Sequence, residues 1–282
     1  MTEIEKLITA ARHYCIENFA FWSDKYSKEQ SGNPYSDNDY NLIPRYNVLL
    51  AILQGVETFV GQEFSSFETC KQALVSIGQN SHSIFTIDGN DELPLLGESG
   101  KFKSTTGRQN RIEKKAIIEE RKKFTDFINS RTNENISDVE SLPYRHRLTD
   151  KEMLFVRQQL LNLWNYDGGY WNPLDENSPK ETVFLMTDNL TTEDCNEIRK
   201  FLISKSNARI YEVTEDRMDY EIEFDSFDIA LYETIVTDKT FEWVIYGSHE
   251  DTITFGGSWL VDFIKKLFAD RPDKLNKWEQ NW

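Results

Sequence analysis

The spacing of apolar residues changes partway along this chain, and that change restricts the possible folds more than any other feature. Up to Trp164 most apolar residues recur every three or four positions, which is the rhythm of one helix face. Beyond Thr182 they form short runs or alternate with polar residues, as in strands. The pattern predicts an α+β fold, with a helical N-terminal region followed by a mainly antiparallel sheet with flanking helices.

Helices are predicted throughout the first half of the chain. Capping-box spacing, in which Ser or Thr precedes Glu by three positions, marks two of the starts, and a proline in a first turn marks another. The expected helices begin at Thr2–Glu5, at Pro44 after a loop over 31–41, at Ser65–Glu68 and near Arg108. The second is expected to close at Gly61, the third near Ser81 and the fourth near Arg131.

A domain boundary is predicted near Ser141. Residues 132–140 are polar and show no helical or strand periodicity, which is typical of a segment between two packed regions. We therefore expect a helical domain at 1–140 and an α+β domain at 141–282.

The second half opens with another capping box, Thr149 with Glu152, ahead of a helix that the sequence Asp167-Gly168-Gly169 stops. A strand, helix, strand unit over 182–214 follows, and further short strands come after it. The expected strands lie at 182–187, 209–214, 219–225, 227–236, 241–246 and 252–255, with helices at 192–204 and from Ser258, which is placed as an N-cap.

Charge and hydropathy exclude several classes of function. The chain has 32 basic and 48 acidic residues, a net charge of −16, which repels phosphate backbones and anionic membrane surfaces. No window approaches the roughly 18 consecutive apolar residues of a membrane span, and the acidic N-terminus lacks the pattern of a signal peptide. We expect no membrane association, no general nucleic-acid binding and a cytoplasmic location.

No cofactor or metal site is predicted. Cys15, Cys70 and Cys195 form an odd set without CxxC spacing and are expected to be reduced, buried thiols. The segment 97–101 resembles a phosphate loop but lacks its spacing, and 88–92 lacks the ligand pattern of a calcium loop. The four histidines, His13, His82, His146 and His249, do not have metal-ligand spacing.

The clearest anomaly is the placement of charge. Residues 212–233 hold nine carboxylates against Arg217, whereas 101–123 hold nine basic residues against three acidic ones. Alternation along one strand puts four carboxylates on a single face, where they suit a basic protein partner, with two tyrosines nearby for apolar contact. These residues are Asp219, Glu221, Glu223 and Asp225, with Tyr220 and Tyr232. A solvated strand face, or neutralisation by the basic helix of the same chain, remains open.

A second hypothesis is an enzyme, most plausibly a hydrolase. His249 lies at a predicted hairpin tip beside Glu250 and Asp251, which would serve with it as acid and base. Trp171 and Tyr170 would form the wall of its pocket, although core packing of these rings is an alternative. A third possibility is local RNA contact by 101–123, which the overall charge opposes.

Two segments resemble parts of uncharacterised bacterial cytosolic proteins. They are Gly169-Tyr170-Trp171-Asn172-Pro173-Leu174 and the run from Trp243 to Gly257. The resemblance covers at most the C-terminal half and implies no activity. In charge and size the chain is also similar to immunity proteins that neutralise toxins, so toxin neutralisation is one version of the partner-binding hypothesis. The partner and the oligomeric state stay open.

Overall fold

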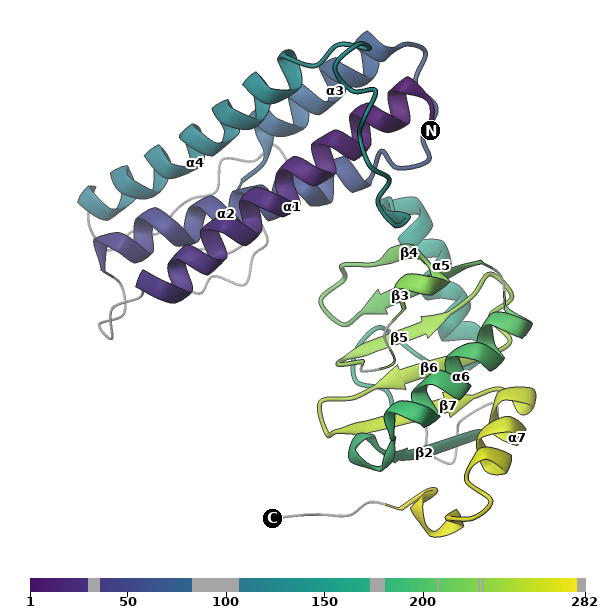
Figure 1. Cartoon of the computed structure of the whole chain (residues 1–282). Helices are drawn as coiled ribbons and strands as arrows, with labels where there is room; N and C mark the ends of the chain where they lie inside the picture. Colours follow the sequence, from purple (N-terminus) through teal and green to yellow (C-terminus); the bar gives the residue numbers. More distant parts are fainter. Residues whose placement is uncertain are drawn as a thin grey trace. The chain divides into compact units, whose positions relative to one another are not determined.

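A computed structural model of the chain, shown in Figure 1, describes residues 1–29, 36–82, 107–172, 181–206, 208–227, 229 and 231–277. The chain separates into two compact units, Met1–Leu142 and Pro143–Trp282, and the boundary expected near Ser141 falls beside this division. Within the described ranges, no helix combines the length and apolar character needed to cross a membrane.

The first unit is a bundle of helices. Its described helices are α1 (Glu3–Glu29), α2 (Asp37–Glu57), α3 (Phe67–Asn80) and α4 (Gly107–Asn129). Helix α2 packs against α1 and α4, and α3 packs against α4 (Figure 1). The core comes from the apolar stripes that the sequence shows, with Leu7, Val48, Leu74 and Phe124 among its fully buried members.

Capping bonds fix where these helices begin. The Thr2–Glu5 box forms as expected: the N–H of Thr2 donates to the Glu5 carboxylate, and the N–H of Glu5 donates to the Thr2 hydroxyl. Helix α2 begins earlier than expected because Ser36 and Asp39 form a capping box. The predicted loop over 31–41 is therefore wrong from Asp37 onward, and Pro44 lies inside the helix instead of in its first turn.

The start of α3 also differs by one residue from the prediction. Its box is Ser66 with Thr69, not Ser65 with Glu68, because the Thr69 hydroxyl accepts the N–H of Ser66 at 3.0 Å. A hydroxyl at the third helical position thus replaces the expected carboxylate.

The described part of the second unit contains a seven-stranded sheet in the order β1-β4-β3-β5-β6-β7-β2, and each pair of neighbouring strands is antiparallel. The strands are β1 (Arg145–Arg147), β2 (Thr182–Met186), β3 (Arg209–Thr214), β4 (Tyr220–Glu223), β5 (Thr234–Thr237), β6 (Val244–Gly247) and β7 (Thr252–Gly256). The helices are α5 (Asp150–Trp164), α6 (Thr192–Lys205) and α7 (Ser258–Leu267), with 3₁₀ turns η1 (Thr187–Asn189), η2 (Phe224–Ser226) and η3 (Pro272–Lys274). This confirms the α+β prediction.

Helices cover both faces of this sheet. Ile198 of α6 and Val261 of α7 pack with Ile222 of β4 in one apolar cluster, on the side that faces the viewer in Figure 1. Trp164 of α5 packs with Val213 of β3 in another cluster, on the opposite face. Both faces of most strands are consequently buried.

Several details of this unit differ from the sequence prediction; one is that β5 begins only at Thr234, although a strand is expected from Phe227. The strand, helix, strand unit does not bring its strands together, because β2 lies at one edge of the sheet and β3 lies among the inner strands. Strand β1 was not predicted. Helix α7 begins at Ser258 itself, after Gly257, whose φ of +106° a residue with a side chain rarely adopts.

The outer edge of β2 is partly closed by the C-terminal segment. The N–H of Phe184 donates to Asn276 Oδ1 at 3.0 Å, and the N–H of Asn276 donates to the Phe184 carbonyl at 2.8 Å. An edge strand otherwise presents unpaired backbone groups to solvent.

Candidate functional site

The acidic strand predicted to bind a partner is largely covered. Asp219 is only 2% exposed, and Arg157 of α5 donates to both of its carboxylate oxygens at 2.7 Å. The N–H of Thr214 donates to the same carboxylate at 3.2 Å. Asp219 directly precedes β4, and α5 brings its own cation, Arg157, to this carboxylate.

Glu221 is engaged in the same way and is 8% exposed. It accepts a hydrogen bond from the Tyr144 hydroxyl at 2.8 Å and contacts Lys239 Nζ at 3.1 Å. Tyr220 is buried, with the Arg145 guanidinium 3.7 Å from its ring centroid. The expectation of a free row of carboxylates is thus wrong for Asp219 and Glu221, and Tyr220 is not available as a contact residue.

Glu223 and Asp225 are exposed, as expected, but they lie at the other end of the strand. Glu223 pairs in register with Arg209 at the start of β3, whereas Tyr220 pairs with Glu212 near its end. Asp225 lies in η2. These two carboxylates do not form a continuous surface with the buried pair.

A different set of carboxylates gathers at the opposite end of the sheet. There β3 ends, β5 begins and the β6–β7 hairpin turns, because Thr214 pairs with Thr234 and Thr234 pairs with Gly247. We call this region the acidic end; its residues are Glu215, Asp216, Glu233, Glu250 and Asp251. All five are exposed or half-buried, and the turn between β3 and β4 also carries Arg217.

His249 and Tyr170 make direct contacts with two carboxylates of the acidic end, Glu233 and Glu250. Glu233 Oε1 lies 3.2 Å from His249 Nδ1, and the Tyr170 ring centroid lies 5.5 Å from that of His249. Burial raises the pKa of Tyr170, and the charge and hydrogen bond of Glu250 raise it further. At pH 7 Tyr170 is therefore a neutral hydroxyl held against a carboxylate.

Tyr246 supports this group from inside. Its hydroxyl donates to Glu215 Oε1 at 2.9 Å and accepts the N–H of Trp171 at 3.4 Å. Burial raises the pKa of Tyr246, and its bond to Glu215 adds to the rise. Glu215 is thereby fixed in place by a side chain of the core.

Trp171 and Tyr170, which were expected to form a pocket wall together, have different environments. Trp171 is buried, lies edge-on to Trp164 and donates its indole N–H to the Trp164 carbonyl at 3.1 Å. It is a core residue, so its assignment to a pocket wall is corrected. Tyr170 is 49% exposed, and Tyr232, beside Glu233, is 65% exposed. These two tyrosines supply apolar surface among the carboxylates.

The proposed acid–base group around His249 also differs from the sequence prediction. The carboxylate that contacts the ring is Glu233, which the sequence reasoning did not include. Asp251 has a φ of 54°, and its carbonyl accepts the N–H and hydroxyl of Thr187. Ser248 is occupied within the hairpin turn, by Thr252 and by the N–H of Glu250. The pairing of β5 with β6 brings Glu233 close to His249. No local sequence motif predicts this contact.

Three lysines in the described part of the basic segment form ion pairs within the bundle. Lys115, Lys122 and Lys123 of α4 pair with Glu119, Asp126 and Glu120. Residues 101–106, and the segments 88–92 and 97–101, lie outside the described residues. This internal pairing weakens the idea of RNA contact by α4.

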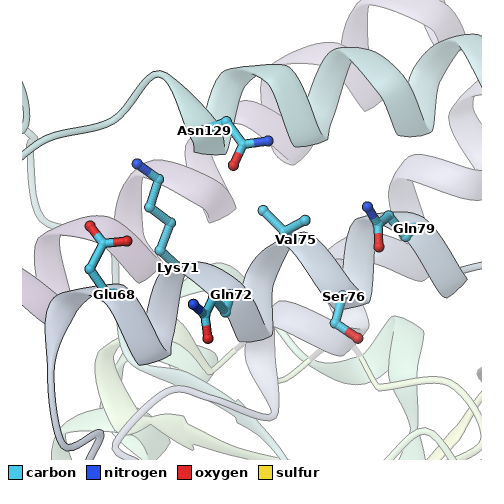
Figure 2. A pocket seen from close by; sticks show the side chains of 7 residues that line it. All are labelled: Glu68, Lys71, Gln72, Val75, Ser76, Gln79 and Asn129. Atoms are coloured by element: carbon cyan, nitrogen blue, oxygen red, sulfur yellow. The ribbon is translucent and has the colours of Figure 1, made fainter.

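A polar groove of about 350 Å³ lies between α3 and the end of α4, as Figure 2 shows. Lys71, which lines it, donates to the carbonyl of Arg131 at 2.8 Å. The rest of its lining is mostly polar and consists of Glu68, Gln72, Ser76, Gln79 and Asn129, with Val75 as the apolar member.

Metal and thiol chemistry find no support in the described ranges. No group of three or more His, Cys, Asp or Glu side chains there is arranged to hold a metal ion. Cys15 and Cys70 are buried, and Cys195 is partly buried. Burial raises the pKa of Cys70 to about 12 and also raises that of Cys15, which keeps both thiols protonated.

The fold and the acidic end together define an α+β protein with a surface of carboxylates and tyrosines. No family model, curated protein or solved structure matches the chain. The resemblance of two segments to uncharacterised bacterial proteins stays a prediction.

Proposed function

We propose that this protein is a non-enzymatic binding protein that engages a basic protein partner through the acidic end. One observation carries the proposal: separate segments of the chain place carboxylates around two exposed tyrosines at a single end of a rigid sheet. The segments are the β3–β4 turn, the start of β5, the β6–β7 hairpin and the loop after α5. A basic toxin is one form of such a partner.

The arrangement suits a basic surface for two physical reasons. Complementary charge accelerates encounter and fixes orientation, but exposed charges alone add little affinity because salt screens them. Tyrosine adds the contact area that is lost from water, and its hydroxyl bonds to polar groups at the rim. Tyr170 and Tyr232 supply that element here.

The experiment compares two triple variants that lose the same charge at different places. Asp216→Asn, Glu250→Gln and Asp251→Asn remove three of the five negative charges of the acidic end and keep an acceptor oxygen at each site. Glu223→Gln, Asp225→Asn and Glu242→Gln do the same elsewhere on the unit. The probe is a fluorescent peptide of alternating lysine and leucine, followed by anisotropy at low and high salt, with a glutamate and leucine peptide as a control.

We expect the first triple variant to bind the lysine peptide at least about tenfold more weakly than the wild type, with a shallower salt dependence. The matched variant should bind within about twofold of the wild type, because screening limits the effect of distant charges. Equal weakening in both variants would mean that net charge alone attracts the peptide, and the proposal would then be abandoned.

A hydrolase remains a second candidate because of one contact. Glu233 at Nδ1 orients the His249 ring, which leaves Nε2 without a hydrogen bond to any described residue, as a general base requires. The hydrolase predicts cleavage of p-nitrophenyl acetate that His249→Asn abolishes. Cleavage no faster than in buffer rejects this candidate and leaves the binding proposal intact.

A further inference from the structure

A second concave site lies within the C-terminal unit, where the first turn of α5 meets the sheet. The cavity has a volume of about 490 Å³, within the range of small-molecule pockets. Its wall includes Glu152 and Phe155 of α5, His146, Tyr211 and Glu221 of the sheet strands, and Lys239 of the loop after β5. It shares no lining residue with the acidic end.

The carboxylates of this cavity already have donors. Glu221 receives the Tyr144 hydroxyl and Lys239 Nζ. Glu152 Oε2 accepts the N–H and hydroxyl of Thr149, at 2.8 and 2.7 Å, and lies 3.2 Å from His146 Nε2. A cationic ligand would therefore have to compete with groups of the chain itself.

Donors, by contrast, are left over. The exposed ammonium of Lys239 contacts Glu221 and has three N–H groups, so it retains donors for a ligand. The Tyr211 hydroxyl forms no hydrogen bond with a described residue, although it lines the cavity. The site thus complements a ligand that brings acceptors.

The apolar wall is held in a fixed shape by a strained residue. Tyr211 stacks on Phe241 at 5.8 Å and 16°, and Phe155 lies edge-on to the same ring at 6.2 Å. Phe241 has a φ of 53°, a conformation that bulky residues rarely adopt, and its carbonyl accepts the Trp164 indole N–H at 3.0 Å. Phe155 itself is 56% exposed beside the cavity.

We propose that this cavity binds a small aromatic carboxylate. The ring lies against Phe155, and the carboxylate accepts hydrogen bonds from Lys239 Nζ and the Tyr211 hydroxyl. A flat apolar ring uses the exposed Phe155 face, and an anionic acceptor uses the Tyr211 hydroxyl and the N–H groups of Lys239 that remain beside its contact with Glu221. The carboxylate can belong to a free acid or to the C-terminal phenylalanine of a peptide.

The test uses the full chain and calorimetric titration. The probes are 3-phenylpropionate, its alcohol 3-phenylpropanol, its amine 3-phenylpropylamine, and a tripeptide ending in phenylalanine. We expect saturable binding of the acid, with the alcohol and the amine at least about tenfold weaker. Tighter binding of the tripeptide than of the acid identifies a peptide C-terminus as the source of the carboxylate; weaker binding identifies a free acid.

Two variants locate the binding. Lys239→Met removes the ammonium, and Tyr211→Phe removes only the hydroxyl while keeping the stack on Phe241. Each variant should bind 3-phenylpropionate about tenfold more weakly than the wild type. Lys266→Met, at an exposed site elsewhere, should leave binding unchanged. Tyr211→Phe keeps the test decisive if Lys239→Met fails to fold. Equal binding of acid and alcohol, absence of saturable binding in the millimolar range, or wild-type affinity in Tyr211→Phe overturns the proposal.

Discussion

Arg157 ties α5 to two strands at once. Its guanidinium binds both oxygens of Asp219, and Nη2 also donates to the Thr214 carbonyl at 2.6 Å. Because Asp219 is buried, removal of Arg157 leaves a carboxylate with no counterion in a site that excludes water.

Arg157→Met should therefore lower the free energy of unfolding by about 3–5 kcal/mol. Urea denaturation followed by circular dichroism measures the change. Lys200→Met is the matched control: it breaks an exposed pair with Glu197 and should cost less than about 1 kcal/mol. A similar decrease in the free energy of unfolding in both variants would show that the Arg157–Asp219 pair stabilises the fold no more than an exposed ion pair does.

The ion pair between Asp194 of α6 and Arg271 of the C-terminal segment is expected to be sensitive to acid. Burial by itself would raise its pKa, but hydrogen bonds from Arg271 and Thr191 outweigh burial and lower the pKa below its usual 3.8. A carboxyl group with a lowered folded-state pKa stabilises the fold above its unfolded-state pKa, and this stabilisation is lost as the pH falls through the folded-state pKa.

Unfolding midpoints in urea should consequently fall as the pH drops below about 4. Asp194→Asn should be less stable than the wild type at neutral pH and should lose less stability on acidification. Parallel pH curves for the two proteins would exclude Asp194 as the responsible group.

At the residue scale, alternation alone correctly placed Asp219 and Glu221 on the same face of one strand. It could not show that α5 covers this face, since Arg157 is far from Asp219 in the sequence and its approach depends on helix packing. The same limit applies to His249, whose carboxylate partner Glu233 comes from another strand. A sequence pattern shows the local spacing of apolar and polar residues. Which charged side chains remain unpaired depends on contacts between residues far apart in the sequence.

Among elements, boundaries with strong local chemistry were predictable. The Thr149–Glu152 box starts α5 as expected because both halves of the signal are local. Strand β1 was missed because Arg145-His146-Arg147 has no apolar alternation; its pairing with β4 alone makes it a strand. Pro44 was expected to mark the start of a helix, but α2 starts earlier, at the capping box of Ser36, and includes Pro44 in its interior.

The start of α7 depends on a glycine conformation. Gly257 has a φ of +106°, and a Cβ built on it would lie 2.6 Å from the Glu242 carbonyl oxygen. Gly257→Ala should destabilise the unit by more than about 1 kcal/mol, because it combines backbone strain with a clash against main chain.

Thermal unfolding of Gly257→Ala measures this effect, with Gly169→Ala as the comparison. A Cβ on Gly169 meets only the flexible Asp167 side chain, at 3.7 Å. An unchanged midpoint in Gly257→Ala would indicate that the turn relaxes without cost.

On the scale of the whole molecule, each unit has its own apolar core. The cluster around Leu7 and Phe124 belongs to the first unit, and the clusters around Ile222 and Trp164 belong to the second. Separate cores of this kind allow independent folding. The change of apolar period along the sequence predicted this α+β organisation, since period depends on secondary structure and not on pairing.

Fragments 1–142 and 143–282 should each fold when produced alone. Circular dichroism and dispersed amide resonances would check this, and the second fragment should retain the lysine-peptide binding of the full chain while the first should not. An unfolded second fragment would contradict the expectation of independent folding.

The contact of Asn276 with Phe184 has a consequence for the lifetime of the protein in a cell. While that amide occupies the backbone groups of β2, the last strand of the sheet offers little to a strand from another molecule. Proteolytic trimming just before Asn276 would remove this partner from Phe184 and expose a template for intermolecular strand addition.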